Sequence, residues 1–230
     1  MPTQMRRTCL IAVMGCLLAA CVPRLPSPAP VQIPAGFPES AYRQAEARGI
    51  KVLRVDPDRS LVTIEVRRAG ALARLGHDHV VASHNVRGYV SLEEGRADLY
   101  LPLDRLVVDE PALRAEAGFD THPSAEAIEG TRSNMLEKVL ESERFPYVLI
   151  HAARSAGDPS KLSVAITLHG TTRTFEIPAQ IETVAGGIAA SGRMTFNQSD
   201  FGIAPYSILN GALQVQDRLD LHFRILAGDK

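Results

Sequence analysis

The sequence predicts an all-β domain, an antiparallel β-barrel of about eight strands with one helical segment packed on its side or at a mouth. Three observations carry this prediction. Apolar and polar residues alternate along many segments, turn residues separate these segments, and regular helices are missing between most of them. Alternation with a period of two gives each strand one apolar face and one wet face. Short connections favour antiparallel neighbours, so a closed barrel or a sandwich is preferred over a parallel α/β sheet.

The alternating segments follow one another along the chain from residue 50 onward. Val62, Ile64 and Val66, for example, are separated by polar residues. Turn-forming pairs such as Glu94-Gly95 and Gly186-Gly187 stand between segments. The predicted strands lie at residues 50–55, 62–66, 86–92, 97–103, 148–150, 162–168, 175–181, 188–196 and 213–225.

One segment, residues 124–144, breaks the alternation. The residue that precedes a proline is kept out of the α region, so Phe145-Pro146 should end a helix before the next strand. A second short helix is expected at residues 40–48. Helical spacing in the long segment is shown by Met135, Leu136, Val139 and Leu140.

The N-terminal residues predict an export signal with a lipid anchor. Arg6 and Arg7 precede an apolar run, residues 9–20, which is shorter than the roughly 20 residues that a membrane-spanning helix needs. Leu18-Ala19-Ala20-Cys21 has the form of a lipobox. We therefore expect residues 1–20 to be a lipoprotein signal peptide and Cys21 to be acylated, for example with palmitate. An ordinary cleaved signal with an incidental cysteine is the alternative.

The segment after Cys21 predicts a tether. Six prolines between residues 23 and 38 favour an extended conformation, so residues 21–49 should hold a barrel domain of residues 50–230 away from the bilayer. Val22, rather than an aspartate, follows the cysteine, which resembles lipoproteins sorted to the outer membrane. The expected location is therefore the periplasmic side of the outer membrane. All three cysteines lie before the tether, so the barrel has no disulfide or thiolate metal site.

Composition and motifs exclude several classes of function. The chain has 25 Lys and Arg against 26 Asp and Glu, and this balance argues against nucleic acid as a partner. It contains no Gly-x-Ser-x-Gly elbow, phosphate loop or His-Glu-x-x-His motif. We therefore expect a protein that is not an enzyme and has no cofactor. A homodimer of two barrels is compatible with this organisation.

The densest group of potential metal ligands is the run of residues 76–79. Its His77 and His79 would share one face of a strand, so they could bind one ion, and His84 could join them after a turn. The group could equally form a structural corner in which each imidazole bonds backbone carbonyls or Asp78. A third interpretation is a polar contact to the head group of a ligand. A bound metal is the least favoured of the three.

The apolar inner face of the barrel is the other candidate site. A barrel of about eight strands encloses either a filled core or one elongated cavity. Small strand residues such as Gly88 and Ala190 would leave room, whereas larger aliphatic residues could simply fill the core. The residues expected to line a tunnel are Val62, Ile64, Val66, Val90, Leu99, Leu101, Ile150, Val164, Ile166, Phe175, Ile177, Met194, Phe196, Leu221 and Phe223.

Several motifs occur in a distinctive order along this region. They include the Phe145-Pro146 junction, the turn at residues 168–173, the Ser-Asp-Phe-Gly-Ile run at residues 199–203 and residues 215–221. In this order they resemble the YceI-like family of bacterial exported proteins, over about residues 50–227. The resemblance implies a lipocalin-like barrel whose apolar tunnel holds a polyisoprenoid chain, with carriage of quinone-type or similar lipids as the role. The lipobox and the Gly-His-Asp-His run at residues 76–79 depart from many members, and the run resembles a His-containing branch.

Together these features predict a membrane-tethered periplasmic protein that binds a polyisoprenoid or similar apolar chain in a barrel tunnel. Exchange of the lipid would occur through a mouth next to the helical segment. One alternative is a periplasmic metal- or redox-linked factor that uses His77, His79 and His84. Another is a structural envelope scaffold without a ligand.

Overall fold

A computed structural model describes residues 31–158 and 160–229 of the chain. The predicted signal peptide, the acylation site Cys21 and the first part of the predicted tether lie outside these residues. Residues 33–230 cluster into one unit. All four hydrophobic clusters of the described chain lie in this unit, so it carries its own core.

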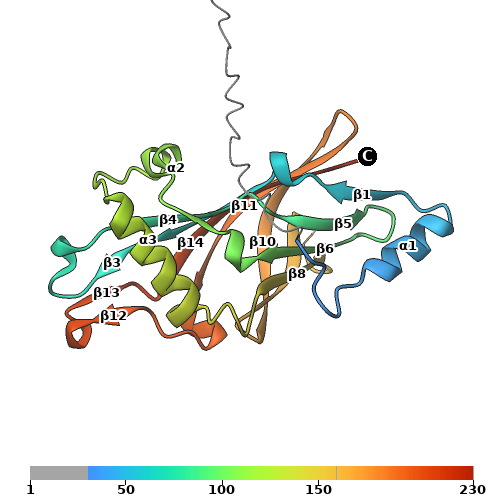
Figure 1. The fold of residues 1–230 in the computed structure, drawn as a ribbon. Helices are drawn as coiled ribbons and strands as arrows, with labels where there is room; N and C mark the ends of the chain where they lie inside the picture. Colours follow the sequence, from blue (N-terminus) through green and yellow to red (C-terminus); the bar gives the residue numbers. More distant parts are fainter. Residues whose placement is uncertain (1–30, 159, 230) are drawn as a thin grey trace, which may run out of the picture. The chain divides into compact units, whose positions relative to one another are not determined.

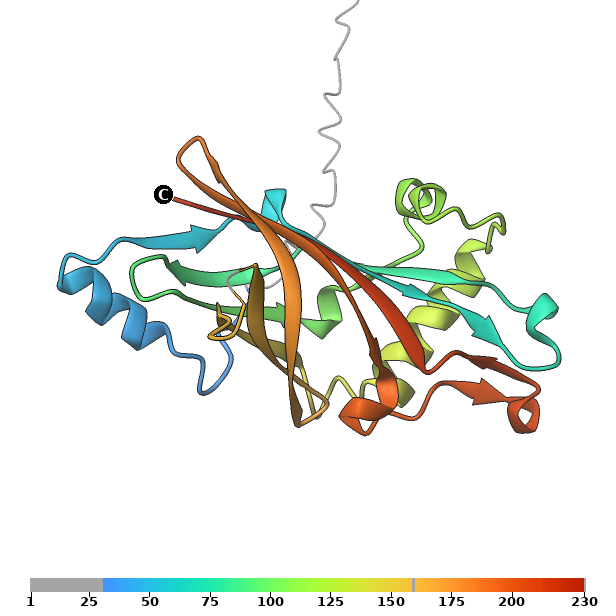
Figure 2. The same ribbon diagram turned by 180° about the vertical axis from the view of Figure 1, so that it is seen from behind.

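Eight antiparallel strands close into a barrel, which confirms the predicted fold class (Figures 1 and 2). Each strand pairs with the next one around the barrel, and pairing of the first with the last completes the ring. In spatial order the strands are β1 (Val52–Val55), β5 (Arg87–Ser91), β6 (Arg96–Pro102), β8 (Tyr147–Arg154), β9 (Lys161–Leu168), β10 (Thr171–Val184), β11 (Gly187–Asn197) and β14 (Arg218–Gly228).

Strand β14 has two partners on one of its sides. Its last residues pair with β1, and its earlier residues pair with β2 (Leu61–Val66). The sheet therefore continues beyond the closed ring through β2, β4 (His79–Ser83) and β7 (Val107–Val108). This extension runs from the barrel toward α3 in Figure 1.

The predicted strand at residues 213–225 is divided in the structure. Its first part is β13 (Leu213–Val215), which forms a separate small sheet with β12 (Ser207–Ile208) and β3 (Arg68–Ala69). The break occurs because the Asp217 carboxylate accepts hydrogen bonds from the backbone N–H and the hydroxyl of Ser199. Five 3₁₀ turns connect the described strands: Pro57–Arg59, Ala73–Leu75, Leu103–Arg105, Gln198–Phe201 and Leu209–Gly211.

The predicted helix at residues 124–144 is confirmed. Helix α3 (Ala125–Asn134) continues into a π-helical turn, Met135–Val139. The Ser124 hydroxyl accepts a hydrogen bond from the Ala127 N–H and caps the helix. Leu136 is buried in a cluster with residues of β4, β7 and the turn that precedes β7. The helical segment therefore packs across one end of the barrel.

The short predicted helix is also present, as α1 (Glu39–Ala47). Its Tyr42 and Ala45 are fully buried and pack against Val52 and Tyr89 of the barrel wall. The folded part therefore begins ahead of the predicted boundary at residue 50, because the apolar face of this helix belongs to the core. A further helix, α2 (Pro111–Glu116), was not predicted. No helix of the described chain is long and apolar enough to cross a membrane.

Candidate functional site: the barrel cavity and its polar end

The inward faces of the strands enclose an apolar cavity. Its larger part has a volume of about 410 Å³ and lies between the barrel strands, the α3 segment and the small sheet. A narrower part of about 170 Å³ lies toward β5, β6 and the end of β10. We call the two parts together the lumen. They meet at four residues that line both: Val62, Ile150, Ile166 and Leu221.

The structure brings the predicted tunnel residues together around this lumen, with one exception. The Phe175 ring packs beside Phe196 and Phe201, at ring-centroid distances of 6.5 and 6.1 Å, and does not line the lumen. The role of the others as ligand contacts stays a prediction. The lining residues among those predicted are Val62, Ile64, Val66, Val90, Leu99, Leu101, Ile150, Val164, Ile166, Ile177, Met194, Phe196, Leu221 and Phe223.

Short side chains help to keep the narrower part open. Ala97, Ala152 and Ala190 line it from three different strands. An alanine reaches less far into the barrel than a leucine or phenylalanine would, so the opposite walls do not meet. The lumen volume lies in the range of small-molecule pockets when its larger part is considered alone.

The larger part of the lumen has a polar end. Arg68, His77 and His79 line it beside otherwise apolar walls. Among the lining residues of this part, Arg68 is the one with a permanent charge. Its guanidinium donates to the Gly76 carbonyl at 2.8 Å and lies 3.8 Å from the Asp78 carboxylate. The charge at this end is therefore compensated within the protein.

A buried ion-pair network holds His79 in place. Nδ1 of His79 lies 2.6 Å from the carboxylate of Asp109, whose side chain is completely buried. Asp109 also accepts hydrogen bonds from the Val80 N–H at 3.0 Å and from Arg114 at 2.5 Å. Arg114 in turn donates to the backbone carbonyls of Asp78 and Thr121, each at 2.6 Å. The network thus joins β4, the start of α2 and the loop that follows α2.

The protonation state of Asp109 follows from these contacts. Burial by itself raises the pKa of this carboxyl, but the hydrogen bonds from His79, Val80 and Arg114 outweigh it and lower the pKa below its usual value. The group is therefore an ionised carboxylate, which can only accept hydrogen bonds. Nδ1 of His79 must then carry the proton, and Nε2 of the neutral ring is an acceptor.

The three predicted histidine ligands do not form a metal site. His84 instead lies 2.7 Å from Glu110 in a largely exposed pair. His77 and His79 do lie close together, with ring centroids 6.3 Å apart and planes at 72°. In the described residues no group of three or more His, Cys, Asp and Glu side chains is arranged to hold an ion. The metal interpretation of His77, His79 and His84 is therefore not supported, because their nearest polar partners are carboxylates of the protein.

Sequence reasoning missed Asp109 and Arg114, which orient His79. Asp109 adopts a left-handed backbone conformation, with φ of 59°, directly before the Glu110-Pro111 start of α2. A proline at the first helical position was a usable signal for α2. Nothing in the spacing of the sequence linked this aspartate to a histidine 30 residues earlier.

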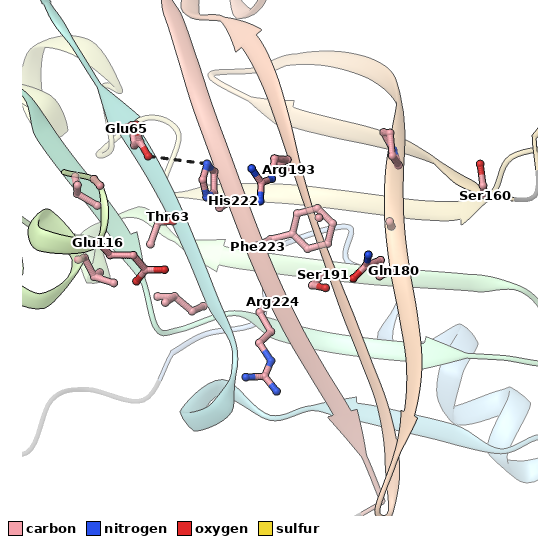
Figure 3. Close-up of a pocket in the computed structure, with 17 residues that line it drawn as sticks. Thr63, Glu65, Glu116, Ser160, Gln180, Ser191, Arg193, His222, Phe223 and Arg224 are labelled. Atoms are coloured by element: carbon pink, nitrogen blue, oxygen red, sulfur yellow. Dashed lines mark ion pairs between the residues drawn. The ribbon is translucent and has the colours of Figure 1, made fainter. Parts of the chain in front are cut away.

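A larger groove lies on the opposite, wet face of the same strands, with a volume of about 880 Å³ (Figure 3). Side chains of both charge signs line it, including Glu65, Glu116, Arg193 and Arg224. His222 lies 3.9 Å from Glu65 across neighbouring strands. This groove presents the outward polar residues that alternate with the lumen residues. Its mixed charges favour no single class of ligand, so the lumen is the stronger candidate site.

The fold and the lumen define a small barrel with an apolar interior large enough to hold a ligand. Residues 53–227 match the YceI-like domain, so the chain belongs to the YceI-like domain family. No curated protein sequence gives a significant match to the chain.

Solved structures support the same fold. A polyisoprenoid binding domain from Saccharophagus degradans, implicated in plant cell wall breakdown, is similar with a TM-score of 0.56 and 10% identity, covering 79% of this chain and 99% of that chain. BcnA from Burkholderia cenocepacia has a TM-score of 0.49 and 14% identity, covering 75% and 98%. A YCEI protein from Campylobacter jejuni has a TM-score of 0.39 and 17% identity, covering 59% and 72%.

Proposed function

We propose that this protein is a non-enzymatic lipid-binding protein that holds a polyisoprenoid or similar apolar chain in its lumen. The observation that carries the proposal is the apolar cavity that runs between the inward faces of the closed barrel. Each methylene group that leaves water for such a cavity stabilises the complex by about 0.8 kcal/mol. A flexible hydrocarbon chain is therefore the ligand class that this lining suits.

Family membership supports the proposal. The chain belongs to the YceI-like domain family, and a structure with the same fold is a polyisoprenoid binding domain in another bacterium. A chain-like ligand also matches the form of the lumen, in which a wider part and a narrower part meet at a shared waist.

Exchange of the lipid is proposed to occur at the end near α3 and the small sheet. Leu75 and Ile208 line the lumen there and are 64% and 42% exposed. The neighbouring Leu209 is 64% exposed and has φ of 52°, a conformation that leucine seldom adopts. Exposed apolar side chains beside an opening are typical of surfaces that contact lipid or protein. They would give a lipid chain an apolar path between a membrane and the lumen.

Attachment to the membrane is part of the proposal and rests on the sequence. The lipobox at residues 18–21 favours acylation of Cys21, and Val22 favours sorting to the periplasmic side of the outer membrane. Subcellular fractionation tests it. The protein should follow the outer-membrane fraction, and Cys21→Ala should release it or leave it with an uncleaved signal. Equal fractionation of the two forms would contradict the anchor.

Bound lipid can be identified directly. A chain that begins at residue 31 contains all the described core clusters and can be purified without detergent. We expect native mass spectrometry to show an additional mass, and organic extraction to recover an isoprenoid or a lipid of similar length. If repeated preparations yield no lipid and the protein takes up no added isoprenoid, the proposal is wrong.

A further inference from the structure

We propose that the polar end of the lumen recognises the hydroxyl group of an isoprenoid alcohol or phenol through His77 and His79. The inference rests on the proposed function and specifies the chemistry of the ligand's head group. It arises from three observations: the free nitrogen atoms of the two rings, their spacing and the balanced charge around them.

His79 supplies a hydrogen-bond acceptor. Its Nδ1–H is committed to the buried Asp109 carboxylate, at 2.6 Å. Nε2 of the neutral ring therefore has a lone pair, and it forms no hydrogen bond within the described chain. The ring lines the lumen, and Arg114 and Val80 hold its carboxylate partner from behind. This acceptor is thus fixed in orientation before any ligand arrives.

His77 supplies the matching donor. Its Nδ1 is buried and has no hydrogen-bond partner in the described residues. A buried N–H without a partner is rarer in proteins than a buried acceptor without one, so the proton of the neutral ring belongs on Nε2. The same ring lines the lumen. The two imidazoles therefore offer one donor and one acceptor.

A hydroxyl group is the complement of this pair, because it both donates and accepts one hydrogen bond. The ring centroids lie 6.3 Å apart, a separation that one oxygen atom can bridge with two hydrogen bonds of about 2.8 Å. A carbonyl or an ether oxygen would satisfy the donor of His77 and leave the acceptor of His79 unpaired.

The surrounding charges favour a neutral head group over a phosphate. The guanidinium of Arg68 is engaged by the Gly76 carbonyl and faces Asp78, and Arg114 is paired with Asp109. A phosphate would bring at least one negative charge that these arginines already have compensated. Desolvating that charge without a new partner is costly, so the site should discriminate against it.

The test compares isoprenoids that differ only at the head: geranylgeraniol, its methyl ether and its monophosphate. Dissociation constants are measured on the chain from residue 31. For the unaltered protein we expect the alcohol to bind about 3- to 10-fold more tightly than the ether, the effect of one net hydrogen bond. The phosphate should bind more weakly than the alcohol.

Variants assign the effect to the site. His77→Phe should bring the alcohol-to-ether ratio close to one while binding of the ether persists, and His77→Gln should restore part of the preference. His84→Phe is the matched control, because His84 belongs to the same segment but does not line the lumen. Its ratio should equal that of the unaltered protein. Melting curves of all variants check that each is folded.

Three results would overturn the proposal: equal binding of alcohol and ether, an unchanged ratio in folded His77→Phe, or tighter binding of the phosphate. Each of these leaves the lipid-binding function standing, because all require that isoprenoids bind. If none of the three compounds binds, the proposed function fails as well.

Discussion

Two buried aspartates of this barrel each bind a histidine, and they differ in what surrounds the pair. Asp98 on β6 accepts a hydrogen bond from the Tyr42 hydroxyl at 2.7 Å and lies 2.8 Å from Nδ1 of His151. Asp109 binds His79 in the same way. The His151 side chain is 52% exposed, whereas the His79 side chain is 13% exposed and lines the lumen.

This difference separates an anchor from a candidate site. The Asp98 pair lies under α1 and joins that helix to the barrel wall through Tyr42, so its function is structural. The Asp109 pair presents the second nitrogen of its histidine at the lumen. The histidine–aspartate contact is the same in both places, and the position of the remaining ring nitrogen determines what the pair can do.

The largest effect is expected from Asp109→Asn. The change leaves the buried Arg114 guanidinium without its carboxylate, and removing one partner of a buried ion pair costs about 3 to 5 kcal/mol. Asparagine tolerates the left-handed backbone at this position, so the loss will report the charge and not backbone strain. Urea unfolding measures it. A loss below about 1 kcal/mol would mean that the network contributes little to this end of the barrel.

A smaller loss is expected from Tyr42→Phe on the anchor side. The variant removes the hydrogen bond to the Asp98 carboxylate, and bonds to charged groups contribute about 1.5 to 3 kcal/mol. Tyr89→Phe is the matched control, since the Tyr89 hydroxyl reaches Glu39 at 3.1 Å in a less buried position. Hydrogen exchange should show faster opening of α1 in Tyr42→Phe alone. Equal losses in the two variants would remove the distinction.

The stability of the Asp109 network should depend on acidity. Since folding lowers the pKa of Asp109, the folded state is favoured by the ionised carboxylate above the unfolded pKa of about 3.9. That contribution is lost as the pH falls through the lowered folded pKa. The free energy of unfolding should therefore decline below about pH 4 more steeply in the unaltered protein than in Asp109→Asn. Parallel pH curves for the two proteins would contradict this assignment.

The smallest effect is expected from His84→Leu. The His84–Glu110 pair is largely exposed, and such pairs contribute about 0.2 to 1 kcal/mol. Binding of isoprenoids should not change, because His84 does not line the lumen. A marked loss of lipid binding in this variant would connect the exposed pair to the site and blur the contrast with His79.

Much of the fold could be predicted from local patterns. Alternation located the barrel strands and placed nearly all of the chosen inward residues at the lumen, because strand parity determines the face. The helix after residue 124 followed from its apolar spacing and the Phe145-Pro146 stop. Phe175 shows the limit: it has the inward parity, yet its ring packs against Phe196 and Phe201 beside the lumen.

Features that depend on distant partners could not be predicted. The strand expected at residues 213–225 is interrupted because Asp217 binds Ser199. The fate of the histidine cluster depended on Asp109 and Arg114, which approach His79 only once β4, β7 and α2 are assembled. Adjacent positions in the sequence suggested a metal site, whereas long-range carboxylate contacts determine how these rings are used.

The central claim is that an isoprenoid chain occupies the lumen, and Val62 tests it most directly. Val62 lines both parts of the lumen, whereas its neighbour Thr63 faces the outer groove. We will compare isoprenoid binding by Val62→Phe and Thr63→Phe with that of the unaltered protein, after checking that both are folded. The account predicts that Val62→Phe obstructs the waist and weakens binding at least tenfold, while Thr63→Phe binds normally. Undiminished binding by folded Val62→Phe would contradict it.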